Sequence, residues 1–100
     1  MSAQILTEVS ATVAADRETE LVNGYHEITS GGVPDGLVRT ELLHGPDRQW
    51  RVQTVWRDRA ALEAVRARPE PPAALQLFKS VGADPVVRVY EVEDRHVAAP

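Results

Sequence analysis

Apolar and polar residues alternate along the first part of the chain. Over residues 4–13, QILTEVSATV, Ile5, Val9 and Val13 fall on one side and Leu6 on the other. This period of two, rich in β-branched residues, predicts a strand.

The period then changes to that of a helix. Leu21, Tyr25 and Ile28 form an apolar stripe at helical spacing, and Asp16 before it is typical of an N-cap. Ser30-Gly31-Gly32 predicts the end of this helix, because glycine is common just past a helix C-terminus.

Two further strands are predicted at 37–44, LVRTELLH, and from about Gln49 to Arg57. The intervening Gly45-Pro46-Asp47 is turn chemistry, and so short a connection makes the two strands an antiparallel hairpin.

The last third of the chain predicts two helices and a strand. Asp58 is placed to cap a helix that Pro69 ends, and a short helix, AALQLFKSV, follows Pro72 at its first turn and closes at Gly82. VVRVYEV, residues 86–92, is the fourth strand.

The order β-α-β-β-α-(α)-β predicts an α+β fold of the ferredoxin-like βαββαβ type, with a four-stranded antiparallel sheet. We expect one domain over residues 1–100, with its core at about 4–93 and a flexible tail at 94–100.

The alternation divides the sheet into two faces, one of which carries both tryptophans and suits the cover of the helices. Its predicted members are Ile5, Thr7, Val9, Val13, Val38, Thr40, Leu42, His44, Trp50, Val52, Thr54 and Trp56.

The other face mixes apolar groups with opposite charges, and a second copy of the chain pressed against it would bury the apolar groups and pair the charges. A monomer with one solvated face is the alternative. The predicted homodimer surface comprises Leu6, Arg39, Glu41, Leu43, Arg51, Gln53, Val55, Arg88 and Tyr90, and Leu37 is expected on the same face.

Composition narrows the possible partners. Eleven Lys and Arg against 15 Asp and Glu give a net charge of −4, which disfavours binding to nucleic acid or to an anionic membrane. The absence of cysteine excludes disulfides and thiolate chemistry, and no secretory signal is visible, so we expect a cytoplasmic protein.

The stretch WRDRAALEA, in which Trp56 closes a strand before an Asp-started helix, resembles the antibiotic biosynthesis monooxygenase domain. The resemblance extends over about residues 4–93 and rests on the order and spacing of the elements. It implies a ferredoxin-like fold that dimerises into an α+β barrel, with a pocket between sheet and helices. It also implies an oxygenase that uses no metal or flavin, acting on a small aromatic such as a polyketide anthrone or a quinol.

The haem-degrading branch of this family is not expected. By alignment the chain has Val9 or Glu8 where that branch has a strand Asn, and Val65 and Leu75 where it has Trp and His. The Asn of the anthrone oxygenases is not matched either.

Cofactor-independent oxygenation requires an apolar cavity, a base and a donor to the developing oxyanion. His44 and His26 are the candidate bases, each with a plain surface or rim role as the alternative. The predicted substrate pocket comprises Tyr25, Thr40, Trp50, Thr54, Trp56 and Phe78, all of which could instead be ordinary core or strand residues. No metal-ligand spacing is present among the histidines.

The leading hypothesis is therefore a homodimeric monooxygenase without a bound cofactor. A non-catalytic ligand-binding or structural dimer, and a cyclase-like enzyme on the same fold, are the alternatives.

Overall fold

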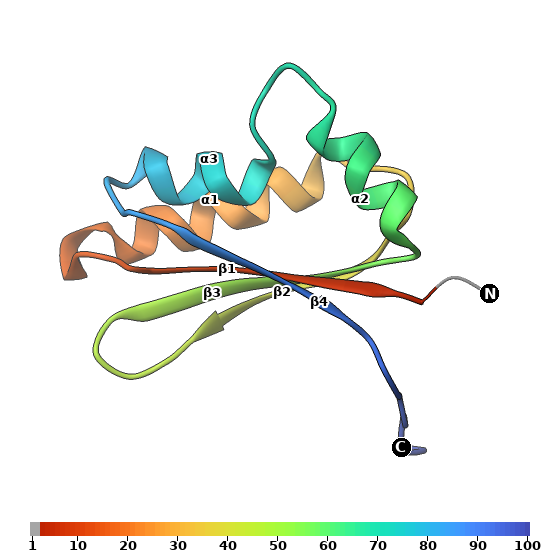
Figure 1. Ribbon diagram of the computed structural model, residues 1–100. Coiled ribbons are helices and arrows are strands. Elements are labelled where there is room, and N and C mark those ends of the chain that lie inside the picture. The colour runs from red at the N-terminus through yellow and green to blue at the C-terminus, as the bar shows by residue number, and fades with distance from the viewer. Residues whose placement is uncertain (1–2) are drawn as a thin grey trace.

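The computed structural model describes residues 3–100, so Met1 and Ser2 of the predicted domain lie outside the described residues. Three α-helices cover one face of a four-stranded antiparallel sheet, and no helix lies on the opposite face (Figure 1). The predicted α+β fold is confirmed. The elements are β1 (Ile5–Thr12), a 3₁₀ turn (Ala15–Arg17), α1 (Glu18–Ser30), β2 (Leu37–His44), β3 (Gln49–Trp56), α2 (Arg59–Arg66), α3 (Ala73–Ser80) and β4 (Val86–Glu91).

The strand order is β2-β3-β1-β4, so the first and third strands along the chain form the centre of the sheet. In the central β1–β3 pair, Ile5 lies opposite Trp56, and Val9 lies opposite Val52. Side chains alternate between the two faces of a sheet along each strand, and residues directly opposite one another lie on the same face. These four residues therefore share the helix-covered face.

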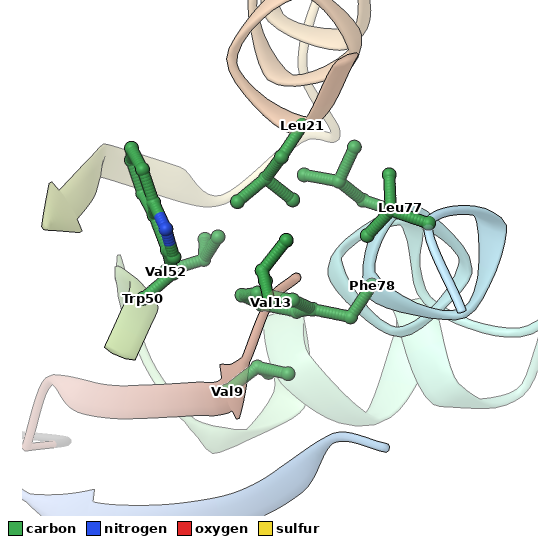
Figure 2. Close-up of a cluster of buried hydrophobic side chains, with 8 residues drawn as sticks. Val9, Val13, Leu21, Trp50, Val52, Leu77 and Phe78 are labelled. Atoms are coloured by element: carbon green, nitrogen blue, oxygen red, sulfur yellow. The ribbon is translucent and has the colours of Figure 1, made fainter. Parts of the chain in front are cut away.

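Two apolar clusters lie under the helices. The larger joins α1, α3 and one end of the sheet, where the side chains of Leu21, Leu77 and Phe78 point toward Val13 and Trp50 (Figure 2). The smaller joins α2 to the other end of the sheet and comprises Ile5, Trp56, Ala61, Leu62 and Val65.

Trp50 is held by a polar contact as well as by packing. Its indole Nε1 donates a hydrogen bond of 2.8 Å to Oε2 of Glu18, the first residue of α1. A buried indole N–H needs such an acceptor. This bond fixes the N-terminal end of α1 over the hairpin end of the sheet.

The start of α1 differs from the expectation. Asp16 lies inside the 3₁₀ turn, and the N-cap of α1 is Arg17, which makes no capping bond. Arg17 instead donates hydrogen bonds to Glu20 and to the carbonyl of Ser80 at the end of α3. The hydrogen bond to Glu20, with its negative charge, raises the pKa of the Arg17 guanidinium. The other predicted cap is confirmed, since Asp58 accepts a hydrogen bond of 2.9 Å from the Ala61 amide.

A β-bulge in β2 makes the predicted position of Leu37, on the uncovered face of the sheet, wrong. The pairing with β3 shifts between Leu37 and Arg39, so Leu37 packs against the smaller cluster under the helices. Val38 is 46% exposed and does not join the core. A bulge adds one residue to a strand and so reverses the alternation beyond it, which the period of two cannot reveal.

Some residues on the uncovered face of the sheet are buried, although the face carries many charged groups. Val55 is only 4% exposed and Glu8 is 8% exposed, because both lie on the central strands between neighbouring side chains. Glu8 accepts hydrogen bonds from Arg51 and Gln53, each of 3.1 Å.

Residues 94–100 have no regular secondary structure. The Arg95 guanidinium donates a hydrogen bond to the side chain of Gln4 at the other end of the chain. Among residues 3–100, no helix has the length and apolar character needed to cross a membrane.

The loop before β2 depends on a glycine. Gly36 has a φ of +88°, and a Cβ placed there would lie 2.4 Å from the Cβ of Ala61 on α2. The loop and the helix can approach this closely only because Gly36 has no side chain.

A pair of glycine substitutions separates the two constraints at Gly36. Gly32 also has a positive φ, of +98°, but a Cβ there would meet no atom within 4 Å. We expect Gly32→Ala to lower the free energy of unfolding by about 1–2 kcal/mol, the cost of the left-handed backbone alone. Gly36→Ala should cost roughly 1–3 kcal/mol more, from the added overlap. Urea denaturation followed by Trp fluorescence measures both, and equal losses for the two variants would show that the approach to Ala61 is not limiting.

Candidate active site

A cavity of about 270 Å³ lies between the sheet and the three helices. The sheet forms its floor, the helices and the loops before β2 and α3 form its walls, and its lining is mostly apolar. The lining residues are Thr7, Val9, Tyr25, Ile28, Thr29, Gly32, Val33, Pro34, Leu37, Thr40, Val52, Thr54, Trp56, Leu62, Val65, Arg66, Pro72, Ala73, Ala74, Leu75, Leu77 and Val87.

The cavity lies where the two apolar clusters meet. Val9 and Val52 belong to the larger cluster, and Trp56 to the smaller one. Between these two levels of the sheet lies the pair Thr7 and Thr54, whose side chains face the cavity. The sheet therefore places hydroxyl groups at the point where neither apolar cluster fills the interior.

Three threonines form a row across three strands. Thr54 on β3 pairs with Thr7 on β1 and with Thr40 on β2. The hydroxyl oxygens of Thr40 and Thr54 are 3.1 Å apart, within hydrogen-bond distance. We call Thr7, Thr40 and Thr54, together with Tyr25, the hydroxyl row.

Tyr25 and Trp56 complete the hydrogen bonds of this row. The Tyr25 hydroxyl of α1 donates to Oγ1 of Thr40 at 3.4 Å, and the Trp56 indole donates to Oγ1 of Thr7 at 3.1 Å. When the Thr40 hydroxyl donates its hydrogen bond to Thr54, the hydroxyl hydrogens of Thr54 and Thr7 can both be donated to a ligand. The row then has two hydroxyl donors, on neighbouring strands, that are available in a mostly apolar cavity.

The row carries no formal charge. Its members are neutral hydroxyls, and Thr7 and Thr54 are both buried, at 7% and 6% exposure. Preorganised neutral donors in a dry site stabilise a developing negative charge more strongly than water-exposed donors do.

Four of the predicted pocket residues line the cavity: Tyr25, Thr40, Thr54 and Trp56. Trp50 and Phe78 do not line it. Both belong to the larger apolar cluster, where α1 and α3 pack on the sheet, and they are therefore core residues.

His44 also lies outside the cavity. Its ring stacks on that of Trp50, with centroids 3.9 Å apart and the planes inclined by 7°. Its Nε2 atom is 3.1 Å from Oε2 of Glu18, the same oxygen that accepts the Trp50 hydrogen bond. The imidazole is therefore part of a contact between α1 and the hairpin.

His26 is exposed on α1 and does not line the cavity either. It follows Tyr25 directly, and a helix turns by about 100° per residue, so the two side chains face different directions. No carboxylate and no imidazole is found among the cavity residues of the described chain.

Thr7 and Arg66 line the cavity but were not among the predicted site residues. The alternation along β1 places Thr7 on the helix-covered face, but only the register of β1 on β3 places it beside Thr54. Arg66 could have been found by its spacing, because it lies four residues after the buried Leu62 on α2, although Arg66 itself is exposed.

Within residues 3–100, no group of three or more His, Asp or Glu side chains could hold a metal ion.

No known family model matches the sequence, and no curated protein is significantly similar to it. Solved structures do match.

A protein from Deinococcus radiodurans, provisionally described as an antibiotic biosynthesis monooxygenase, superposes with a TM-score of 0.74 at 14% identity, covering 96% of this chain and 99% of that one. A variant of SnoaB, a cofactor-independent oxygenase from Streptomyces nogalater, gives 0.72 at 16% identity, covering 94% and 97%. Rv0793 from Mycobacterium tuberculosis gives 0.71 at 20% identity, covering 95% and 100%.

These matches extend over nearly the whole of each chain, and at such low identity they establish the fold. The fold that the sequence resemblance implied is confirmed: this chain has the fold of the antibiotic biosynthesis monooxygenase domain.

Proposed function

We propose that the chain is a monooxygenase that oxidises a small aromatic substrate of the anthrone or quinol type with molecular oxygen and no bound cofactor. The observation that carries the proposal is the hydroxyl row on the floor of the apolar cavity. The likeness to SnoaB, described as a cofactor-independent oxygenase, adds to it at the level of the fold.

The size and lining of the cavity suit a flat aromatic molecule. A volume of about 270 Å³ lies just below the roughly 300–1,000 Å³ typical of small-molecule sites. The indole of Trp56 and the aliphatic residues of α2 and α3 provide apolar walls for two or three fused rings.

The chemistry requires little more than stabilisation of an anion. Loss of a proton from an activated methylene gives an electron-rich anion whose charge spreads to the neighbouring oxygen, which accepts hydrogen bonds from Thr54 and Thr7 in the proposed pose. The anion transfers its electrons to oxygen, and a peroxide forms at the carbon. Loss of water from that peroxide leaves a ketone. One oxygen atom enters the product and the other leaves as water, so no external reductant is needed.

The proton acceptor in this scheme is solvent at the mouth of the cavity, since the described lining has no carboxylate or imidazole. The same observation favours the second candidate function, a binding protein that holds an aromatic ligand without chemistry. A cyclase-like enzyme would also use a hydroxyl row, but it would not need oxygen.

The three functions differ in their oxygen requirement. We expect anthrone to consume one oxygen molecule per molecule of anthraquinone formed, and ¹⁸O₂ to place one labelled atom in the product. An oxygen electrode and mass spectrometry measure both. Saturable binding without oxygen uptake would favour the binding protein, and turnover under anaerobic conditions would favour the cyclase-like enzyme.

The hydroxyl row is tested by Thr54→Val, which removes the hydroxyl and keeps the shape of the side chain. We expect kcat for anthrone to fall by about tenfold to a hundredfold, because one donor to the developing oxyanion is lost. KM should change little.

Thr12→Val is the matched control, because Thr12 is an exposed residue of the same sheet outside the cavity. His44→Phe, which keeps a ring stacked on Trp50, is measured alongside. A fall as large as that of Thr54→Val would make His44 the base and contradict the proposed scheme.

We further propose that two copies of the chain associate through the uncovered face of the sheet to form an α+β barrel. Three apolar side chains of this face are well exposed, Leu43 by 38%, Tyr90 by 47% and Val86 by 53%. Charges of both signs lie on the same face: Arg51 pairs with Glu8, Arg39 pairs with Glu41, and Arg88 adds a positive charge. In a two-fold dimer, positive groups of one copy can therefore face negative groups of the other. The same face of a second copy carries the same apolar groups and charges of both signs, so it can cover this face.

Sedimentation equilibrium tests this association. We expect a mass of about twice the 11.0 kDa of one chain for the protein and for Val22→Lys, a control on the exposed side of α1. Tyr90→Lys should give the mass of one chain, because it places a charge in the apolar contact. A wild-type mass of 11.0 kDa at every concentration would contradict the proposal.

A further inference from the structure

Arg66 is the one formally charged side chain on the described wall of the cavity. It is the last residue of α2, and it follows Leu62 by four residues and Val65 by one. Residues four apart share a helix face, so Arg66, although itself exposed, lies at the edge of the face by which α2 contacts the core. Its aliphatic stem can lie along apolar neighbours while the guanidinium reaches the cavity mouth.

The protein itself makes no use of this guanidinium. Within residues 3–100 four ion pairs join Arg to Asp or Glu, and His44 contacts Glu18; Arg66 takes part in none of these contacts. No side-chain hydrogen bond of the described chain involves it, although Glu63 lies three residues earlier on the same helix. Its five N–H donors are therefore available to a ligand.

Arg66 is the formal positive charge at this part of the cavity lining. The C-terminal end of α2 itself carries a partial negative charge, and the whole chain has a net charge of −4. The guanidinium therefore supplies a positive charge that α2 would otherwise lack here. A guanidinium fits a carboxylate because its planar fork makes two parallel hydrogen bonds.

The cavity thus has two polar features of different kinds on two different walls. The sheet floor offers the neutral hydroxyl row, and α2 offers the cation Arg66. Everything else in the lining, apart from the Thr29 hydroxyl, is apolar side chain or backbone. A molecule that satisfies both features has a neutral oxygen at one end of an aromatic body and an anion at the other.

We propose that the substrate of this cavity is an aromatic carboxylate, which Arg66 selects by binding the carboxylate while the hydroxyl row holds the phenol or keto oxygen. This rests on the proposed function of the cavity as a substrate site and goes beyond it by naming a substrate class. Arg66 is then a specificity-determining residue, and it orients the ring so that the reacting carbon lies near the hydroxyl row.

Binding of a matched pair of probes tests the inference. 6-Hydroxy-2-naphthoate has a hydroxyl and a carboxylate at opposite ends of a bicyclic ring, and 6-hydroxy-2-naphthamide is its neutral counterpart. By calorimetry of the full chain we expect the carboxylate to bind about tenfold more tightly than the amide, because a carboxylate is charged and accepts two bonds from the guanidinium, whereas an amide offers one neutral oxygen.

Three variants assign that difference to Arg66. Arg66→Gln should bring the two affinities within about twofold of each other, chiefly by weakening carboxylate binding, whereas Arg66→Lys should keep part of the preference. Arg68→Gln is the control, since Arg68 is exposed, as Arg66 is, but does not line the cavity. It should behave as the unaltered protein does. Circular dichroism checks that each variant is folded.

Equal affinities in the unaltered protein, a preference that survives Arg66→Gln, or no binding of either probe would each overturn the inference. These titrations are made without oxygen, so they do not depend on turnover. A carboxylate preference that requires Arg66, with no oxygen uptake on any substrate, would keep the inference and remove the monooxygenase. Oxygen uptake with neutral anthrone and no carboxylate preference would do the opposite.

Discussion

The register between β1 and β3 is the constraint on which the rest of the structure depends. It places Ile5 opposite Trp56, Thr7 opposite Thr54 and Val9 opposite Val52 on the face beneath the helices. Apolar, hydroxyl and apolar pairs thus follow one another along the centre of the sheet. A slip of β1 by one residue would turn Ile5, Thr7 and Val9 to the other face and bring Glu8 under the helices. The charge of Glu8, held by Arg51 and Gln53 on the uncovered face, therefore works against that slip.

The interruption of the core is as important as the core itself. The larger cluster anchors α1 and α3, and the smaller cluster anchors α2. Had the middle pair been apolar, the helices could have closed on a continuous interior. Threonines there keep hydroxyls that must find hydrogen-bond partners. Thr40 is the partner of Thr54, and Trp56 is the partner of Thr7. The outcome is a mostly apolar cavity with a row of neutral hydroxyls on its floor and, among residues 3–100, one charged lining residue, Arg66 on α2.

The two tryptophans, though only six residues apart on β3, have different roles. Trp56 is both a core residue and a wall of the cavity, with its N–H bonded to Thr7. Trp50 is bonded to Glu18 and stacked on His44, and it closes the hairpin end of the sheet against α1. His44 is thereby drawn into a structural contact, although its residue type and its place beside an apolar face had made it a candidate base. Tertiary contacts of this kind decide whether a titratable side chain reaches a site.

The sequence by itself determined the order of the elements, the hairpin, the Asp58 cap and the face that carries the tryptophans, because periodicity and capping are local properties. It also placed Tyr25, Thr40, Thr54 and Trp56 toward one interior. Only the tertiary structure decided that Thr7 joins this row, that a bulge moves Leu37 under the helices, and that Trp50 and Phe78 fill the core instead of lining the cavity. Strand register and the bulge arise from contacts between residues far apart in the chain, which no local pattern records.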